Sequence, residues 1–282
     1  MHQFLILGGD PRQLYLAQLL KQAGHETVLY YDNPSPFTSL GEAMEDSHII
    51  LCPVPFTKDG AVIYSVNRLE GLDIPGLLGG LKEGHILFGG NIPAAVKNRC
   101  ALFRIPCHDF MDMDEVAWKN AAATAEGAVA EAISLSPLNL HKSRCLVTGW
   151  GRCACTLAGK LKGMDALVTI AARDRSKLAQ AYSMGYHTVP LGGLDTVIGQ
   201  YDFIFNTIPA MVLDASLILD ASQAGRLKPE AAVIDIASSP GGADFAALEQ
   251  AGVRARLCPG LPGRYSPMAS ARILYEAVME HL

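Results

Sequence analysis

The chain has 282 residues, of which 50% are hydrophobic and 18% charged, and its formal net charge is −5. Disordered chains combine low hydrophobicity with high net charge, so this composition excludes intrinsic disorder. The lack of a basic excess argues against a nucleic-acid binder, which needs Lys and Arg to neutralise phosphates. No apolar run approaches the roughly 18 residues of a membrane-spanning helix, and the start of the chain has no basic signal-peptide region. We therefore expect a globular, cytoplasmic protein of one or two domains.

The seven cysteines indicate neither a disulfide framework nor a metal centre. Disulfides are rare in a reducing cytoplasm. Cys153 and Cys155 stand close together, but no further Cys or His lies at the spacing of a zinc site. We expect small, mostly buried thiols and no bound metal.

Short apolar runs alternate with helical patterns in the first half, which indicates βαβ units. The predicted strands lie at residues 4–7, 27–31, 48–52 and 85–88. Pro11 can begin a helix that ends before Gly24. The preceding loop, Gly8-Gly9-Asp10, has no G-x-G-x-x-G pattern, and a carboxylate at a helix N-terminus would repel a phosphate. The first half is therefore predicted to be Rossmann-like without a nucleotide site.

An alanine-rich helical pattern at residues 115–133 is expected to connect this half to a second series of βαβ units. The later elements are strands at 144–148, 166–171, 202–206, 232–236 and 253–257 and a final helix at about 267–281. We predict an α/β fold of two Rossmann-like domains with parallel sheets. Residues 1–118 with 266–282 form a substrate domain, and residues 119–265 form an NAD(P)-binding domain.

The strongest local motif is Gly149-Trp150-Gly151-Arg152-Cys153-Ala154, a G-x-G-x-x-A pattern between a predicted strand and helix. Gly149 permits a tight turn, Gly151 lets the backbone approach a pyrophosphate, and Ala154 lets the helix pack closely on the sheet. The helix N-terminus would then donate N–H groups to the phosphates, with Arg152 and Cys153 in its first turn. An ordinary strand–helix turn is the alternative.

The end of the next predicted strand bears on which dinucleotide binds. An NAD site places an acid about 20 residues after the glycine loop to bind the ribose hydroxyls. Here the chain reads Ala172-Arg173-Asp174-Arg175-Ser176. Arg173 and Arg175 could pair with a 2′-phosphate, which favours NADP. NAD stays open, because Asp174 could instead bind the ribose.

Ligands of open α/β sheets lie beyond the carboxyl ends of the strands. Three later strand ends are followed by loops rich in Pro and Gly, which bring the backbone close to a flat ligand without bulky side chains. Plain turn chemistry is the alternative. From these loops we predict further cofactor-binding residues: Asn206, Thr207, Ile208, Pro209, Ala237, Pro259 and Gly260.

At these residues the chain resembles the dipicolinate synthase A-subunit family of spore-forming bacteria. Gly8-Gly9-Asp10 with Arg12-Gln13 is similar to the opening G-G-D-x-R-Q of that family, and three C-terminal runs match its signatures. These runs are Asn206-Thr207-Ile208-Pro209, Ser239-Pro240-Gly241-Gly242-Ala243-Asp244-Phe245 and Pro259-Gly260-Leu261-Pro262-Gly263. The resemblance covers essentially the whole chain, strongly over residues 144–282 and more loosely over residues 25–115.

The resemblance implies an NAD(P)-dependent oxidoreductase that oxidises a dihydro- or hydroxytetrahydro-dipicolinate intermediate to dipicolinate during sporulation. It also implies the architecture of formate/glycerate dehydrogenases, a flavoprotein-like B subunit as partner, and the mother-cell cytoplasm as location. Homo-oligomerisation stays open. The alternatives are a non-catalytic nucleotide-binding subunit and a dehydrogenase of another small carboxylate.

Two departures from the family stand out. Met268 occupies the place of a lysine that follows the Pro-Gly-Leu-Pro-Gly loop, which puts a lysine contact to the substrate in doubt. The helix after the glycine loop begins Arg152-Cys153-Ala154-Cys155, where Arg-Thr-Gly is typical.

A dicarboxylate substrate needs cations or N–H donors, and a guanidinium can bind a carboxylate through two hydrogen bonds. Arg12 is the leading candidate, with Thr57, Asn91 and Arg264 as further ones at loop positions. Asn120 and Thr124, one helical turn apart, look like the family's Asn-x-x-x-Thr-x-Glu-Gly stretch and are added to the substrate set.

A general base would help the ring lose a proton. His108 and Asp109 have suitable chemistry near the predicted domain junction and are the catalytic candidates. Alternatively, the proton passes to water because aromatisation itself drives the step.

Overall fold

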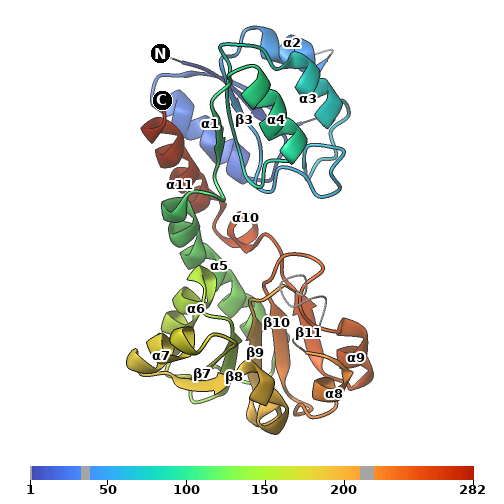
Figure 1. The fold of residues 1–282 in the computed structure, drawn as a ribbon, viewed down its shortest axis with the longest axis vertical. Helices are drawn as coiled ribbons and strands as arrows, with labels where there is room; N and C mark the ends of the chain where they lie inside the picture. Colours follow the sequence, from blue (N-terminus) through green and yellow to red (C-terminus); the bar gives the residue numbers. More distant parts are fainter. Residues whose placement is uncertain (1, 33–38, 210–218) are drawn as a thin grey trace. The chain divides into compact units, whose positions relative to one another are not determined.

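The computed structural model describes residues 2–32, 39–209 and 219–282, and the chain forms two compact units (Figure 1). Unit 1 comprises Met1–Asn120 and Ser266–Leu282, and unit 2 comprises Ala121–Tyr265. The chain leaves unit 1 inside the long helix α5 (Asp114–Leu135) and returns to it after Tyr265. Each unit holds one sheet, so each has its own core.

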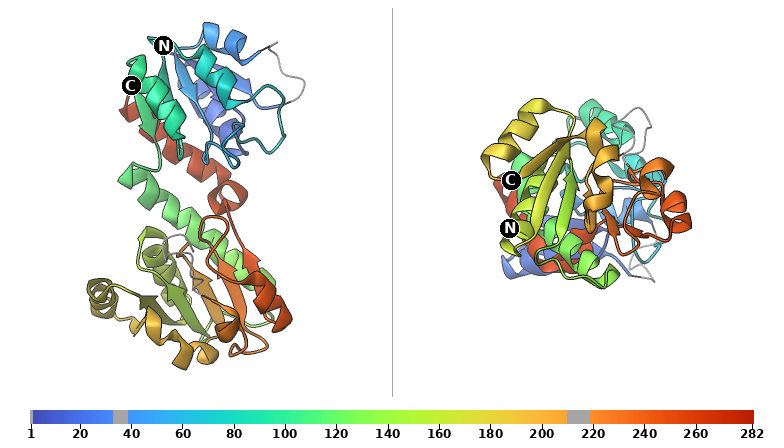
Figure 2. Two further views of the ribbon diagram at one scale, coloured as in Figure 1. Left: turned by 45° about the vertical axis from the view of Figure 1, so that its right-hand side comes forward. Right: turned by 90° about the horizontal axis from the view of Figure 1, so that it is seen from below.

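Unit 1 is a five-stranded parallel sheet in the order β2-β1-β3-β4-β5. Its strands are β1 (Gln3–Leu7), β2 (Glu26–Tyr30), β3 (Ile49–Leu51), β4 (Ile86–Gly89) and β5 (Cys107–Asp109). Its helices are α1 (Arg12–Gln22), α2 (Leu40–Glu45), α3 (Ile74–Gly80), α4 (Ala94–Leu102) and α11 (Pro267–Glu280). Strand side chains alternate between faces, so Phe4 and Ile6 pack with α1 and α11, whereas Leu5 and Leu7 pack with α2, α3 and α4. Figure 2 shows α1 and α11 side by side.

Unit 2 is a six-stranded parallel sheet in the order β11-β10-β9-β6-β7-β8. Its strands are β6 (Arg144–Thr148), β7 (Leu167–Ala172), β8 (His187–Pro190), β9 (Phe203–Asn206), β10 (Ala232–Asp235) and β11 (Arg254–Leu257). Its other elements are α6 (Arg152–Gly163), α7 (Arg175–Ser183), η1 (Leu191–Thr196), η2 (Ile198–Gln200), α8 (Ala221–Ala224), α9 (Phe245–Gln250) and α10 (Leu261–Tyr265). The strand order reverses between β6 and β9. Open α/β sheets bind ligands at such a reversal.

The predicted fold class is confirmed: both sheets are parallel and both are flanked by helices. Every predicted strand occurs with bounds within one residue of those predicted. The prediction missed β5 and β8, which are short edge strands of their sheets. Their mixed sequences, Cys-His-Asp and His-Thr-Val-Pro, carry no apolar run to reveal them. Within the described ranges, no helix is both long and apolar enough to cross a bilayer.

Candidate functional site

The glycine loop of unit 2 lies at the reversal between β6 and β9. Gly149 has a φ of 89°, and a Cβ at this position would lie 2.6 Å from the Oγ1 of Thr207, which follows β9. Its N–H donates to the carbonyl of Ala171 in β7 at 2.7 Å. Only glycine satisfies both the backbone angle and the close approach, so the turn is fixed between the two neighbouring strands.

Gly151 differs from Gly149, because nothing within the described parts of the protein requires it to be glycine. It is the N-cap of α6, its φ is −98°, and a Cβ built on it would meet no described heavy atom within 4 Å. No side chain of the described residues caps this helix. Ala154 and Leu157 are buried in the core below, so the helix is anchored while its N-terminal N–H groups point away from the core. This arrangement matches what a bound phosphate requires.

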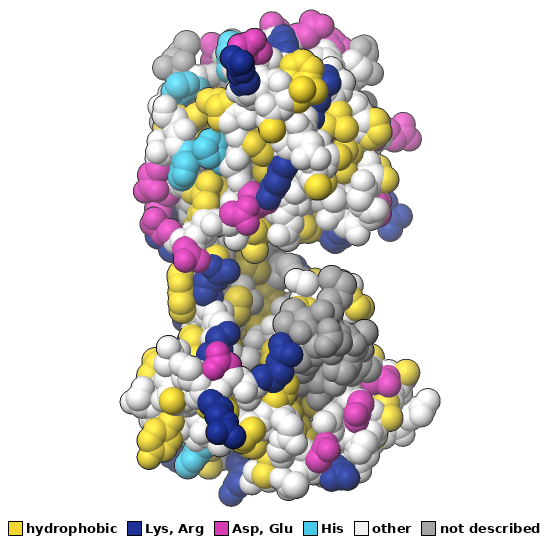
Figure 3. Space-filling view, viewed as in Figure 1, with side chains coloured by type: hydrophobic (Ala, Val, Ile, Leu, Met, Phe, Trp, Pro, Cys, Tyr) yellow, Lys and Arg dark blue, Asp and Glu magenta, His cyan; other side chains and the backbone are white. Residues whose placement is uncertain are grey.

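Basic side chains surround this part of unit 2. In Figure 3, Lys and Arg side chains of the visible face gather over α6 and α7. Arg173, Asp174 and Arg175, at the end of β7, are all exposed. Asp174 is the N-cap of α7, and its Oδ1 accepts the N–H of Ser176 at 2.7 Å. Asp174, which could bind a ribose, therefore already uses one carboxylate oxygen to cap α7.

A buried polar network joins the ends of three adjacent strands. The hydroxyl of Thr148 (β6) donates to Oδ1 of Asn206 (β9) at 2.6 Å, and Nδ2 of Asn206 donates to Oδ1 of Asp235 (β10) at 3.0 Å. All three residues have 0% exposure. Thr207 adds a bond from its hydroxyl to the carbonyl of Thr148 at 2.7 Å. The loops that follow these strands are therefore fixed relative to one another.

Asp235 also shapes the loop after β10. Its Oδ1 accepts the N–H of Ala237 at 3.0 Å, and its Oδ2 accepts the N–H of Gly242 at 2.7 Å. Burial raises the pKa of Asp235 above its usual value, although these bonds oppose the shift. The prediction overlooked Thr148 and Asp235. Their signal is a polar residue that ends an otherwise apolar strand.

The remaining predicted cofactor residues lie at the same edge of this sheet. Ile208 packs beside Gly149, and Nδ2 of Asn206 donates to its carbonyl at 2.9 Å. Pro209 follows it, just before the undescribed residues 210–218. Pro259 and Gly260 follow β11 and are exposed; Gly260 has a φ of 67°. The structure thus brings the predicted set together around one strand reversal.

The corresponding loop of unit 1 is closed by the chain itself. The N–H of Gly9 donates to the carbonyl of Tyr64 at 2.6 Å, and the carbonyl of Gly9 accepts the N–H of Val66 at 2.9 Å. A Cβ on Gly8 would lie 2.6 Å from the same Tyr64 oxygen. Asp10 caps α1, where its Oδ1 accepts the N–H of Arg12 at 3.1 Å. The glycine turn and the helix start that are predicted to bind phosphate in unit 2 thus contact protein groups at the equivalent place in unit 1.

Arg12 is predicted to offer its guanidinium to a substrate carboxylate, and in the structure most of this guanidinium is bound within unit 1. Its Nε and Nη2 bind the carboxylate of Asp10 at 2.9 and 2.7 Å, and Nη2 also donates to the carbonyl of Val54. The Arg12 side chain is only 7% exposed. In this arrangement the guanidinium therefore cannot bind a ligand carboxylate through two nitrogens. Nη1 is the nitrogen without a bond to the described residues.

Thr57 follows β3, which neighbours β1, and Asn91 follows β4, the next strand in the sheet, so both lie at the carboxyl ends of the strands, as Arg12 does. The hydroxyl of Thr57 donates to Asp59 at 3.2 Å and accepts the N–H of Gly60 at 3.0 Å. Both hydrogen bonds of the Thr57 hydroxyl therefore stay within its own loop. Asn91 adopts a φ of 57°, and its side chain is exposed.

Three other substrate candidates lie on or near α5. Asn120 ends the first segment of unit 1, whereas Thr124 belongs to unit 2, where it hydrogen-bonds the thiol of Cys153. Arg264, in α10, is not available as a lone cation, because its Nη2 lies 2.8 Å from the buried carboxylate of Glu131. The sequence predicted a loop position for Arg264, whereas the structure places it in a helix with a partner that the sequence did not reveal.

The two catalytic candidates, Asp109 and His108, both lie in β5 of unit 1. Asp109 accepts N–H bonds from Asn91, Ile92 and Met111 at 2.9, 2.8 and 3.0 Å, and Lys97 lies 2.9 Å from its Oδ2. Burial would raise its pKa, but Lys97 and the N–H groups outweigh burial and lower it. A carboxylate with its oxygens so engaged is a weak base.

His108 packs against rings of unit 1. It stacks on Phe88 with ring centroids 4.7 Å apart and meets His281 edge-on at 4.9 Å. Burial, and then the nearby His281, lower its pKa. These contacts make His108 a packing residue of unit 1, where β5 joins the sheet.

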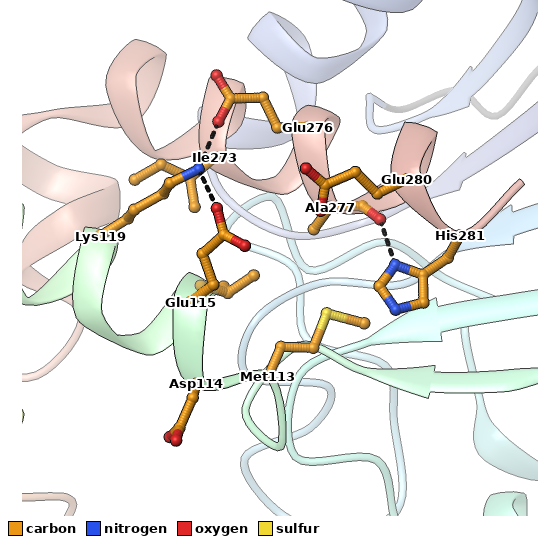
Figure 4. A pocket seen from close by; sticks show the side chains of 10 residues that line it. Met113, Asp114, Glu115, Lys119, Ile273, Glu276, Ala277, Glu280 and His281 are labelled. Carbon is orange, nitrogen blue, oxygen red and sulfur yellow. Dashed lines mark hydrogen bonds and ion pairs between the residues drawn. The ribbon is translucent and has the colours of Figure 1, made fainter.

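Unit 1 also has a cavity of about 260 Å³ between the start of α5 and the end of α11 (Figure 4). Its walls carry four carboxylates: Asp114, Glu115, Glu276 and Glu280. Lys119 lies between two of them, 2.6 Å from Glu115 and 2.9 Å from Glu276. This negative lining disfavours a dianionic substrate. In the described part of the chain all seven cysteines are reduced, and no group of side chains is placed to hold a metal ion.

With this geometry established, comparison with known proteins is informative. Residues 3–111 match the family model described as the N-terminal domain of the dipicolinate synthase A subunit. Over 95% of its length the chain is 28% identical to the A subunit of dipicolinate synthase from Bacillus subtilis (strain 168), of which it covers 92%. The resemblance to the dipicolinate synthase A subunit is confirmed.

Solved structures agree. The crystal structure of the dipicolinate synthase A subunit from Bacillus halodurans superposes with a TM-score of 0.84 at 25% identity, covering 99% of this chain and 97% of that one. A transhydrogenase from Sinorhizobium meliloti gives a TM-score of 0.68 at 13% identity, covering 99% and 92%. The second likeness concerns the fold alone.

Proposed function

We propose that the chain is an NAD(P)-dependent oxidoreductase that acts as the A subunit of a dipicolinate synthase. The observation that carries the proposal is the contrast between two equivalent loops. At the start of α6 no described side chain caps Gly151 and a Cβ there would meet no described atom, whereas at the start of α1 the Asp10 carboxylate accepts the N–H of Arg12. Only one of the two Rossmann-like units, as far as the structure describes them, therefore offers a phosphate site.

The residues at the edge of unit 2 fit a dinucleotide. Gly151 and the first turn of α6, with Arg152 and Cys153, would take the pyrophosphate. Thr207 and Ile208 after β9, Ala237 after β10, and Pro259 and Gly260 after β11 would line the nicotinamide. The network of Thr148, Asn206 and Asp235 holds the ends of β6, β9 and β10 together. When bound, the nicotinamide accepts a hydride, and the protein orients the ring and excludes water from it.

NADP is the proposed dinucleotide. Exposed Arg173 and Arg175 flank Asp174, which is already used as the cap of α7. A 2′-phosphate would gain charge-assisted bonds from these guanidinium groups, whereas a free ribose hydroxyl would compete with the N–H of Ser176 for one Asp174 oxygen.

The proposed substrate is a reduced pyridine-2,6-dicarboxylate, a dihydro- or hydroxytetrahydro-dipicolinate. In unit 1 we assign Nη1 of Arg12 to one carboxylate, because Asp10 fixes the guanidinium and leaves that nitrogen without a bond to the described residues. Asn91, after β4, two strands away in the same sheet, would add an amide donor. Neither His108 nor Asp109 is kept as general base, so the ring proton passes to water as the ring becomes aromatic.

The name of the relatives, which are subunits, suggests a partner. We propose that this chain works with a flavoprotein-like B subunit in the mother-cell cytoplasm of a sporulating bacterium. A non-catalytic nucleotide-binding subunit is the competing function, and the experiment below separates the two.

The test is the reduction of NADP+ at 340 nm by purified chain mixed with the product of dihydrodipicolinate synthase, with and without the B subunit. We expect NADPH and dipicolinate to form in equal amounts. Saturable NADP+ binding without NADPH formation in the presence of the B subunit would instead support the non-catalytic function. No nucleotide binding would refute both.

A further inference from the structure

Unit 2 contains a fully buried carboxylate that the proposed reaction does not use. Glu131 lies on α5 and has 0% exposure. Its Oε2 accepts a bond from Nη1 of Arg256 at 2.6 Å, and its Oε1 accepts one from the hydroxyl of Tyr265 at 2.9 Å. Nη2 of Arg264 lies 2.8 Å from the same Oε1. One carboxylate thus binds three side chains from β11 and α10.

The same face of α5 approaches α10 closely one helical turn earlier. A Cβ on Gly127 would lie 2.9 Å from the Cβ of Leu261 and 3.0 Å from Cδ2 of Tyr265. Leu261 is 1% exposed and belongs to the main core of unit 2. Glycine at position 127 therefore lets α10 pack against α5. The Glu131 carboxylate then holds α10 there through its ion pair with Arg264 and its hydrogen bond from Tyr265.

Glu131 is ionised at neutral pH. Burial disfavours its charged form, but the bonds from Arg256 and Tyr265 and the charge of Arg264 outweigh burial and lower its pKa. Both guanidinium groups are about half exposed, with side chains 45% and 51% accessible. Removing the negative charge would leave both cations in contact with water, so they could move away from α5.

The two elements that Glu131 binds, β11 and α10, are connected by the turn Pro259-Gly260. Before the turn, the N–H of Cys258 donates to the carbonyl of Asp235 at 2.7 Å, and Arg256 is held by Glu131. After the turn, Arg264 and Tyr265 are held by the same carboxylate. The turn is therefore fixed from both sides.

We propose that Glu131 is a positioning residue for the nicotinamide half of the bound dinucleotide, because it holds Pro259-Gly260 in its binding conformation. The inference rests on the proposed nucleotide site of unit 2. The two mononucleotide halves of a Rossmann sheet bind to different strands. Here the adenosine half would contact the loops after β6 and β7, whereas Glu131 acts only on the loop after β11. Preorganising a loop lowers the ordering cost of binding, so losing the carboxylate weakens binding of one half.

The experiment compares Glu131→Gln with the matched control Glu249→Gln, an exposed glutamate of α9 whose carboxylate has no hydrogen-bonded partner among the described residues. Dissociation constants are measured for NADP+ and for adenosine 2′,5′-bisphosphate, which carries only the adenosine half, and melting temperatures are recorded. We expect Glu131→Gln to weaken NADP+ binding about tenfold, since a bond to a charged group is lost, and to leave the bisphosphate affinity unchanged. The control should match wild type for both ligands.

Equal weakening of both ligands in Glu131→Gln, or no weakening of either, would overturn the positioning role. If the wild type binds neither ligand, the nucleotide site itself is refuted, and the two failures are thereby distinguished. Tyr265→Phe removes one of the three bonds without unpairing a charge. It should weaken NADP+ binding by about threefold, again without effect on the bisphosphate, so the inference stays testable even if Glu131→Gln does not fold.

Discussion

The guanidinium of Arg12 donates two hydrogen bonds to the carboxylate of Asp10, two residues earlier in the chain, from Nε at 2.9 Å and from Nη2 at 2.7 Å. Both side chains are nearly buried at the carboxyl end of β1. With Nε and Nη2 bound to Asp10, a ligand would meet a single nitrogen, Nη1, in a fixed position instead of a freely rotating guanidinium. A buried ion pair of this kind contributes little net stability compared with an apolar pair, so its value lies in orientation.

Asp10→Asn tests that orientation. The amide cannot accept two bonds from the guanidinium, so Arg12 should lose its fixed direction while keeping its charge. We expect the KM for the dicarboxylate to rise about tenfold with kcat changed less than about twofold, as for a lost ground-state contact. Asp46→Asn, at an exposed position of the same unit, is the control. An unchanged KM in Asp10→Asn would argue against Arg12 as the substrate contact.

Gly151→Val tests the phosphate site without disturbing the fold. Its φ of −98° suits any residue, and a Cβ would meet no described atom within 4 Å, so the melting temperature should stay within about 2 °C of wild type. A valine side chain would occupy the approach of the pyrophosphate, and NADP+ affinity should fall at least about 100-fold. Gly163→Val, at the open C-terminal end of the same helix, should bind normally. Normal NADP+ binding by Gly151→Val would place the nucleotide elsewhere.

The glycine turn between β6 and α6 could be predicted because its determinants are local. Gly149 and Gly151 lie within one turn between an apolar strand and a helix, and the spacing itself reports the backbone angle and the approach of a ligand. The strands of both sheets were predictable for a similar reason, since buried parallel strands are continuous apolar runs. Edge strands such as β5 lack that signal.

The substrate half could not be predicted in the same way because side-chain partners decide it. Arg264 and its partner Glu131 stand far apart in sequence, and no local pattern reveals that one neutralises the other. Asp109 looked like a free base, but its oxygens receive N–H groups from a loop that follows another strand. Whether such a side chain is available for chemistry depends on tertiary contacts, which no local pattern reports.

Arg175→Ala tests the choice of dinucleotide. If Arg175 pairs with the 2′-phosphate, NADP+ affinity should fall about tenfold while NAD+ affinity stays the same, because NAD+ has no phosphate at that position. Isothermal titration with each nucleotide measures the ratio directly. Arg254→Ala, an exposed arginine on the far edge strand β11, serves as control. A parallel loss for both nucleotides would show that Arg175 does not read the 2′-phosphate.

Asp109→Asn tests the structural role assigned to that carboxylate. Its pKa is lowered in the folded state, although burial opposes this, because Lys97 and three N–H groups favour the charged form. A lowered pKa stabilises the fold fully above the unfolded value of about 4, and that contribution is lost as the pH falls through the folded value. The variant should therefore be about 2 kcal/mol less stable than wild type at pH 7, with the difference shrinking below about pH 4.

Urea unfolding at pH 7, 5 and 3 measures that difference. Asp112→Asn is the matched control, because Asp112 is exposed and is paired with the same Lys97 at 3.1 Å. An exposed pair is worth less than about 1 kcal/mol, so this variant should remain close to wild type at every pH. A pH-independent loss in Asp109→Asn would mean that packing, and not the charge, accounts for the effect. A stability equal to wild type at pH 7, together with lost catalysis, would instead return Asp109 to the role of a base.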